Sequence, residues 1–426
     1  MSVSAGSAHT FWNLSAYMVR RAPFLITRKV LETVLNLATF AILARTLTVE
    51  AFGIYTIVFV FVAVLRLTSI PGLGTAIAQS FARRHGGGFR RAVAVSISGS
   101  LFGSVVLSIG SWWYLADGEI DKGHALLVAA AFFPLLSGLL YWRNAAVGSE
   151  HYVRLLFYDV AAAAVRLAGV AACAFQFDGA LLPIVIAALG GHAAVNVLAT
   201  LHQMRLSVRG QGMEHQSLNY GLLTTAYQVP SIISEHLDKA VLFFLFSAET
   251  LAVYAVAMRI PQLARVLVGE ANATLGPVFA RQKDYSPELR RFSIGLSILY
   301  MAIAVVGTLL VIPVVLPLLA GQSYGSAVPY AQLMMLGVAL GFLGDVQFRF
   351  IKSQLDSRSF LHITVGSTVV NVPLVLALGY GFGLSGVVAA YILRYLSYTL
   401  ICTFVVRSYS RNLQTDPAPA ASVERS

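Results

Sequence analysis

Charged side chains recur inside the apolar segments of this 426-residue chain. The cations within these segments are Arg66, Arg166, Lys239, Arg259, Arg265 and Arg394. The acids are Glu32, Asp159, Glu235, Asp238, Glu270 and Asp345. A charge at the centre of a bilayer costs about 2.5–3.5 kcal/mol on translocon scales. We therefore expect these side chains to pair with one another or to line a wet cavity.

Some of these charges have the spacing of one helix face. The pairs are Arg28 with Glu32, Glu235 with Lys239, and Asp159 with Arg166. Residues four or seven apart lie on the same side of an α-helix, so the spacing predicts structural ion pairs. Glu235 and Asp238 are also candidates to carry a coupling proton or Na⁺, because intramembrane carboxylates serve as relays in transporters.

Four of the arginines have no acidic residue three or four positions away, namely Arg66, Arg259, Arg265 and Arg394. A guanidinium group in an apolar environment suits a phosphate or pyrophosphate, which it grips through two parallel hydrogen bonds. The pattern predicts an anionic ligand. Acidic partners on other helices are the alternative explanation.

The composition places the whole chain in a membrane. Hydrophobic residues make up 57% of the sequence and charged residues only 12%, with a mean hydropathy of +0.74. Soluble domains carry about 25% charged residues, so a soluble enzyme, a coiled coil and a disordered chain are excluded. The net charge of +11 fits the Lys and Arg excess of cytoplasmic loops, and we expect no nucleic-acid partner.

A window of about 20 apolar residues predicts twelve transmembrane helices. They cover residues 24–44, 52–73, 92–115, 124–144, 155–176, 180–202, 219–246, 250–272, 290–319, 329–348, 359–379 and 383–406. Between these spans and at their ends, 22 Lys and Arg residues, Arg143 among them, fall on one side, and only Arg45 and Lys122 fall on the other. The bias predicts cytoplasmic N- and C-termini.

The chain also matches itself at an offset of 199 residues. Leu47–Tyr55 aligns with Phe246–Tyr254, and Arg66 falls on Arg265. Such a repeat predicts two parallel six-helix lobes, 1–204 and 205–407, followed by a disordered cytoplasmic tail, 408–426. Halves of this kind hold a substrate between them and alternate its access by rocking.

Motifs for catalysis or for a cofactor are absent from the sequence. The nine His residues form no metal-ligand pattern, and the two Cys residues, Cys173 and Cys402, lie in separate apolar runs. Pro71–Gly74 resembles part of a glycine-rich loop but is better interpreted as a helix stop. We therefore predict no catalytic residue, no cofactor and no metal.

Several short motifs resemble one known family in their order and spacing. Leu43–Tyr55 resembles the signature of the lipid-linked oligosaccharide flippases of polysaccharide biosynthesis, which belong to the multidrug/oligosaccharidyl-lipid/polysaccharide exporter superfamily. Further matches are Leu237–Lys239, Tyr254–Ala257, Gly321–Tyr324, Asn371 and Gly383–Gly386.

The resemblance implies an all-α membrane fold with two six-helix lobes in a V around a central cationic cavity. It implies movement of an undecaprenyl-pyrophosphate-linked glycan to the outer leaflet of the bacterial inner membrane, for O-antigen, capsule or exopolysaccharide. Arg66, Arg259 and Arg265 would meet the pyrophosphate, while Arg166 and Lys239 would shape the cavity potential. Arg394 would be a further cavity cation. Membrane lipid, a polysaccharide polymerase and a chain-length regulator are the other implied partners.

Other readings remain open at this stage. A cation-coupled multidrug exporter of the same superfamily would need cavity acids without matching cations. A lipid II flippase usually has fourteen spans, and a membrane-embedded glycan polymerase would need a large outer loop that this chain lacks. A lipid scaffold without transport also fits. The sequence does not identify the glycan, the coupling ion or the oligomeric state.

Overall fold

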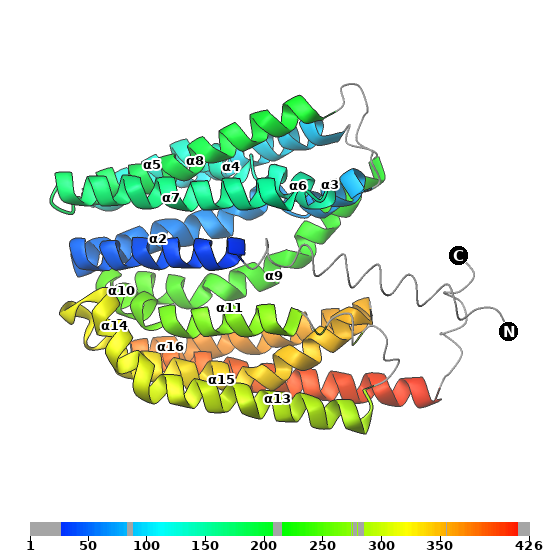
Figure 1. The fold of residues 1–426 in the computed structure, drawn as a ribbon. Coiled ribbons are helices and arrows are strands. Elements are labelled where there is room, and N and C mark those ends of the chain that lie inside the picture. The colour runs from blue at the N-terminus through cyan, green and yellow to red at the C-terminus, as the bar shows by residue number, and fades with distance from the viewer. Residues whose placement is uncertain are drawn as a thin grey trace. The chain divides into compact units, whose positions relative to one another are not determined.

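The computed structural model describes residues 27–82, 88–207, 215–273, 275, 279, 285–354 and 356–415. Within these ranges all regular secondary structure is helical (Figure 1). The predicted all-α membrane fold is therefore confirmed. The chain divides into two compact units, Met1–Val229 and Pro230–Ser426. This division falls inside a helix, and the predicted lobe boundary at residues 204–205 stays a prediction.

The first unit begins with a helix over residues 27–46. It continues with α2 (Val49–Leu65), the 3₁₀ turn η1 (Arg66–Ser69), α3 (Leu73–Ala82), α4 (Phe89–Ala116), α5 (Ile120–Ser137), α6 (Tyr141–Gly148), α7 (Tyr152–Gln176) and α8 (Leu181–Leu206). Helix α4 packs along α5, α7 packs along α8, and α5 contacts α8. Helix α9 (His215–Leu245) begins in this unit and ends in the next.

The second unit contains the remaining helices of the described chain. They are α10 (Ala248–Ala257), α11 (Arg259–Ala273), α13 (Pro287–Val306), the π-helical turn η3 (Gly307–Val311), α14 (Ile312–Ala320), η4 (Gln322–Tyr324), α15 (Ala327–Ser353) and α16 (Ser357–Thr415). Helix α15 packs against α16, α13 and α11, so it forms the centre of this unit.

Each predicted span falls mainly on helix where the structure describes it, with interruptions at residues 70–72 and 138–140. By length and apolarity, eight helices in the described chain can cross a membrane, or nine when the bent pair α10–α11 counts as one span. One of these, Arg358–Arg411, covers the last two predicted spans. They join at Gly383, whose φ of 60° and ψ of −136° are not helical, so α16 consists of two helices that meet at a kink there.

Residues 408–415, which the sequence analysis assigned to a disordered tail, instead continue α16. The ring of Tyr409 meets that of Phe350 at 6.1 Å, and this contact ties the extra turns to α15. Residues 416–426 lie outside the described ranges.

The internal repeat has a local structural counterpart. The Thr48 hydroxyl accepts a hydrogen bond from the Ala51 N–H at 3.2 Å and caps α2. At the matching position, the Ser247 hydroxyl accepts one from the Thr250 N–H at 3.1 Å and caps α10. Both helices thus begin with the same type of N-cap, which satisfies an otherwise unpaired backbone donor.

The predicted second span is broken next to Arg66. Helix α2 ends at Leu65, and after η1 the residue Ile70 takes a left-handed backbone with φ 56°. Pro71 follows, and α3 begins at Leu73. The helix stop predicted here is therefore a short interruption, because a new helix begins at Leu73, three residues after Ile70.

The break leaves backbone carbonyl groups without helical hydrogen-bond donors, and side chains donate hydrogen bonds to these carbonyl groups. The Tyr141 hydroxyl lies 2.9 Å from the carbonyl oxygen of Ser69 and 2.6 Å from that of Ile70. The Ser96 hydroxyl donates to the Ser69 carbonyl at 3.0 Å. Because irregular backbone in a membrane is tolerated only with such partners, these contacts hold the turn that follows Arg66.

Helix α4 approaches this turn so closely that only glycine fits at position 99. A Cβ on Gly99 would lie 2.1 Å from the carbonyl oxygen of Thr68. In the same helix, a Cβ on Gly110 would meet its nearest neighbour, a Leu126 methyl, at an ordinary 3.8 Å. An alanine substitution at Gly99 therefore tests the backbone crowding, whereas the same substitution at Gly110 tests helix propensity alone.

We expect Gly99→Ala to lower the free energy of unfolding by about 1–3 kcal/mol, because α4 must move away from the turn. Gly110→Ala should raise it by about 0.5–1 kcal/mol, because alanine is the better helix former. Thermal unfolding in detergent measures both. Equal transition temperatures for the two variants would contradict the close approach.

Candidate functional site

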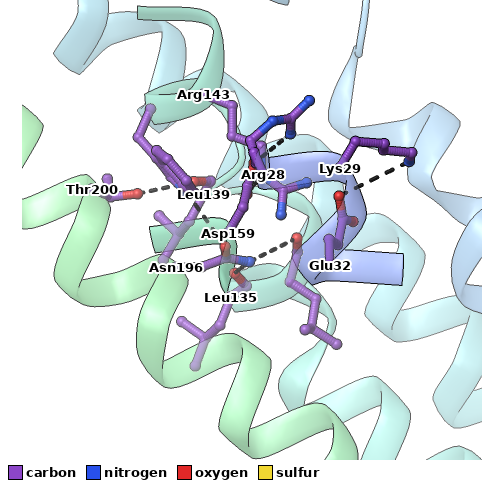
Figure 2. Close-up of polar contacts among 11 residues, drawn as sticks. Arg28, Lys29, Glu32, Leu135, Leu139, Arg143, Asp159, Asn196 and Thr200 are labelled. Atoms are coloured by element: carbon purple, nitrogen blue, oxygen red, sulfur yellow. Dashed lines mark hydrogen bonds and ion pairs between the residues drawn. The ribbon is translucent and has the colours of Figure 1, made fainter. Parts of the chain in front are cut away.

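One buried carboxylate joins three helices of the first unit. Asp159 lies in α7, and its side chain is only 2% exposed. Its Oδ2 accepts a hydrogen bond from Arg28 Nη1 at 2.7 Å, and its Oδ1 lies 2.8 Å from Arg143 Nε (Figure 2). Arg28 comes from the helix over residues 27–46, and Arg143 comes from α6.

These contacts correct two pairs predicted from spacing. Glu32 pairs with Lys29 at 3.9 Å, and Arg28 reaches across to Asp159 (Figure 2). Arg166 donates to the side-chain oxygen of Asn36 and makes no ion pair with Asp159. Seven residues of α-helix rise about 10 Å, which is too far for a short aspartate side chain to meet its neighbour two turns away.

Arginine is in surplus around this carboxylate. The groups that act electrostatically on Arg66 include Arg143 and Tyr141. Arg66, Arg143 and Arg166 all act on His192 of α8. The arginines that act on His192 therefore include two, Arg66 and Arg166, that have no ion pair with Asp159, which is already shared by Arg28 and Arg143.

Arg143 is the member of this group that sequence reasoning missed, since its segment ends at the predicted cytoplasmic side. The predicted fourth span breaks between Ser137 and Tyr141, and α6 begins there as a separate short helix. Pro134 lies one turn before the break and was the available signal.

The second unit holds a tighter polar cluster around Asp238 of α9. Lys239 Nζ lies 3.2 Å from Asp238 Oδ1 and donates to the Glu235 backbone carbonyl at 3.2 Å. The Tyr254 hydroxyl donates to Asp238 Oδ2 at 2.5 Å. Lys239 thus pairs with Asp238, whereas the sequence predicted a pair with the carboxylate of Glu235, which is exposed.

Further side chains complete a small pocket on this carboxylate. The lining residues are Asp238, Tyr254, Asn371, Val375, Val387, Tyr391 and Arg394. The space among them does not admit a water molecule. Arg394, which has no acid nearby on its own helix, here lies within electrostatic reach of Asp238.

The remaining predicted arginines of the second unit lie on α11. The Arg265 guanidinium lies 5.2 Å from the centre of the Tyr395 ring, a cation–π distance, and interacts electrostatically with Asp345. Arg259 is half-buried at the first residue of the helix. Among the described residues, no three His, Cys, Asp or Glu side chains are grouped as metal ligands.

We expect Asp159→Asn to lower the free energy of unfolding by about 3 kcal/mol, because Arg28 and Arg143 would lose their shared counterion. The control is Glu119→Gln, which removes a 2.8 Å pair with Lys122. Since Glu119 is 46% exposed, the control should cost less than about 1 kcal/mol. Thermal unfolding in detergent tests both, and a loss no larger than that of the control would refute the structural role of Asp159.

Comparison with known proteins identifies the family and the fold. The family model described as polysaccharide biosynthesis protein matches residues 42–329. A search of curated proteins gives no match. Solved structures with a similar fold include several membrane transporters.

An inward-facing multidrug resistance MATE family transporter of the MOP superfamily is 16% identical, with coverage of 91% of this chain and 96% of its own and a TM-score of 0.69. The lipid II flippase MurJ, in an inward closed conformation, is 14% identical over 92% and 90% of the two chains, with a TM-score of 0.71. A MOP superfamily transporter from Pyrococcus furiosus is 14% identical over 93% and 96%, with a TM-score of 0.64. At these identities the likeness shows a shared fold. Because the family match spans more than half of the sequence, the chain belongs to the polysaccharide biosynthesis protein family.

Proposed function

We propose that this protein is a flippase that moves a polyprenyl-pyrophosphate-linked oligosaccharide across the bacterial inner membrane. The glycan would serve a surface polysaccharide, whether O-antigen, capsule or exopolysaccharide. Membership of a polysaccharide biosynthesis family and the fold shared with a lipid II flippase support transport of a lipid-linked glycan. Both chain ends would lie in the cytoplasm, and alternating access of the two lobes would carry the substrate.

The observation that carries the proposal is the arginine surplus of the first unit. Arg66, Arg143 and Arg166 share the electrostatic environment of His192, and the nearby Asp159 already pairs with Arg28 and Arg143. A pyrophosphate offers the negative charge that this cluster lacks. Its oxygens accept the paired hydrogen bonds that a guanidinium group donates.

Arg66 is the leading candidate ligand within this cluster. Its side chain is exposed, and it is the first residue of η1, four residues before the left-handed backbone of Ile70 interrupts the helix. Interrupted helices in transporters bring polar groups to a substrate site. Arg265 and Arg259 would contribute positive potential from the second unit, whereas Arg394 and Lys239 lie at the carboxylate of Asp238.

The same charges argue against a cation-coupled multidrug exporter. Such a protein needs a buried acid that is available to a proton or a cationic drug, but Asp159 and Asp238 both have cationic partners. The Pyrococcus furiosus transporter is described as having a binding pocket of reversed polarity that suggests a different function. The shared fold is therefore compatible with a cation-rich site in this chain.

The test uses proteoliposomes that contain a fluorescent undecaprenyl-pyrophosphate oligosaccharide, with dithionite added outside to quench accessible probe. We expect the wild type to move the probe between leaflets. Arg66→Ala should slow the initial rate by about ten- to a hundredfold, since a hydrogen bond to a charged group contributes about 1.5–3 kcal/mol. Arg265→Ala should slow it by less, because Arg265 is already balanced by Asp345 and would contribute only positive potential. Lys122→Gln, in a predicted outer loop, is the control and should transport normally.

Each rival has its own outcome in the same vesicles. If the wild type moves no probe but expels cationic dyes along a proton gradient, the protein is a drug exporter. If the recovered glycan is longer than the one supplied, the protein is a polymerase. If both arginine variants transport normally, the proposed pyrophosphate site is wrong, whereas the proposed flippase activity is unaffected.

A further inference from the structure

The oxygen atoms around Asp238 form the kind of site that binds a small cation. Oδ1 accepts the backbone N–H of Lys239 at 2.8 Å, and Oδ2 accepts the Tyr254 hydroxyl at 2.5 Å. Asp238 is 4% exposed and Tyr254 is fully buried. Carboxylate and carbonyl oxygens in such a setting are the ligands that hard cations prefer.

Asn371 adds an acceptor that has no partner. Its Nδ2 donates to the Ser234 hydroxyl at 2.7 Å and to the Ser234 backbone carbonyl at 3.2 Å. These two bonds fix the amide, and its Oδ1 is buried without a hydrogen-bond donor among the described residues. Asn371 is 1% exposed and lines the same pocket as Asp238. A buried acceptor left in this way favours a positive charge nearby.

The positive charge at this pocket belongs to the protein itself. The ammonium of Lys239 lies 3.2 Å from Asp238 Oδ1 and is held in place by the Glu235 carbonyl. Arg394, which lies on α16, also lines the pocket. His236, which lies near both cations, and Glu235 are the other titratable groups around them. Lys239 and Arg394 place two positive charges beside the one buried carboxylate, and the space among the lining residues does not admit a water molecule, so a free ion has no room there.

We propose that this pocket is a cation site occupied by the protein's own side chain. The Lys239 ammonium, supported by Arg394, takes the place of a free monovalent cation. On this proposal Asp238 binds neither Na⁺ nor H⁺ in the wild type, and a coupling ion would have to bind elsewhere. Removing the tethered charges opens a latent Na⁺ site on Asp238, Tyr254 and the Asn371 Oδ1. This inference does not depend on the proposed glycan substrate.

The experiment measures the transition temperature of purified full-length protein in NaCl and in choline chloride at equal ionic strength. The wild type should show no difference. The double variant Lys239→Ala/Arg394→Gln should be less stable than the wild type in choline. It should gain about 1–3 °C when Na⁺ exceeds its dissociation constant about tenfold, because a ligand that binds only the folded state stabilises it.

Two further variants separate the site from a general salt effect. Lys239→Arg keeps a tethered cation and should show no Na⁺ dependence. Adding Asp238→Asn to the double variant should abolish the Na⁺ dependence, because the carboxylate is gone. Stabilisation of the wild type by Na⁺ would overturn the proposal, and this arm needs no variant to fold. A folded double variant with equal stability in both salts would overturn it too.

Discussion

The constraint on which this structure depends is the absence of water from the bilayer interior. Every buried charge and every interrupted backbone group must find its partner within the protein. Asp159 meets Arg28 and Arg143 from two other helices. The Tyr141 hydroxyl serves two carbonyl groups where α2 breaks. These contacts fix the places where helices cross, because a partner that moved away would leave an unpaired group in an apolar medium.

The two units meet this constraint around different carboxylates. In the first unit Asp159 is shared by Arg28 and Arg143, and Arg66 and Arg166 lie within electrostatic reach of the same histidine as Arg143. In the second, Asp238 is matched by Lys239 and by Arg394, and the pocket is filled by side chains. The filled pocket at Asp238 therefore contributes to the internal stability of the second unit, whereas the first-unit arginines are the residues to which the proposed function assigns the anion.

Sequence patterns predicted the helices well because helix placement depends on local apolarity. The capping residues Thr48 and Ser247 also follow from local sequence, and their equivalence appears in the repeat. Pairing was predicted poorly, since spacing reports only neighbours on one helix. Asp159 bonds Arg28 across 131 positions in the chain, and no local pattern indicates that contact. The same limit hid Arg143, whose position depends on a break between two helices.

The internal repeat does not give equal functions to every pair of matched residues. Arg66 and Arg265 occupy equivalent positions, so sequence alone gives them equal roles. Their surroundings differ, because Arg66 has Arg143 nearby while Arg265 faces Asp345 and the Tyr395 ring. A guanidinium beside another cation gains more from an added phosphate than one already balanced by a carboxylate. The duplicated arginine is therefore better suited to hold an anion in the first unit than in the second.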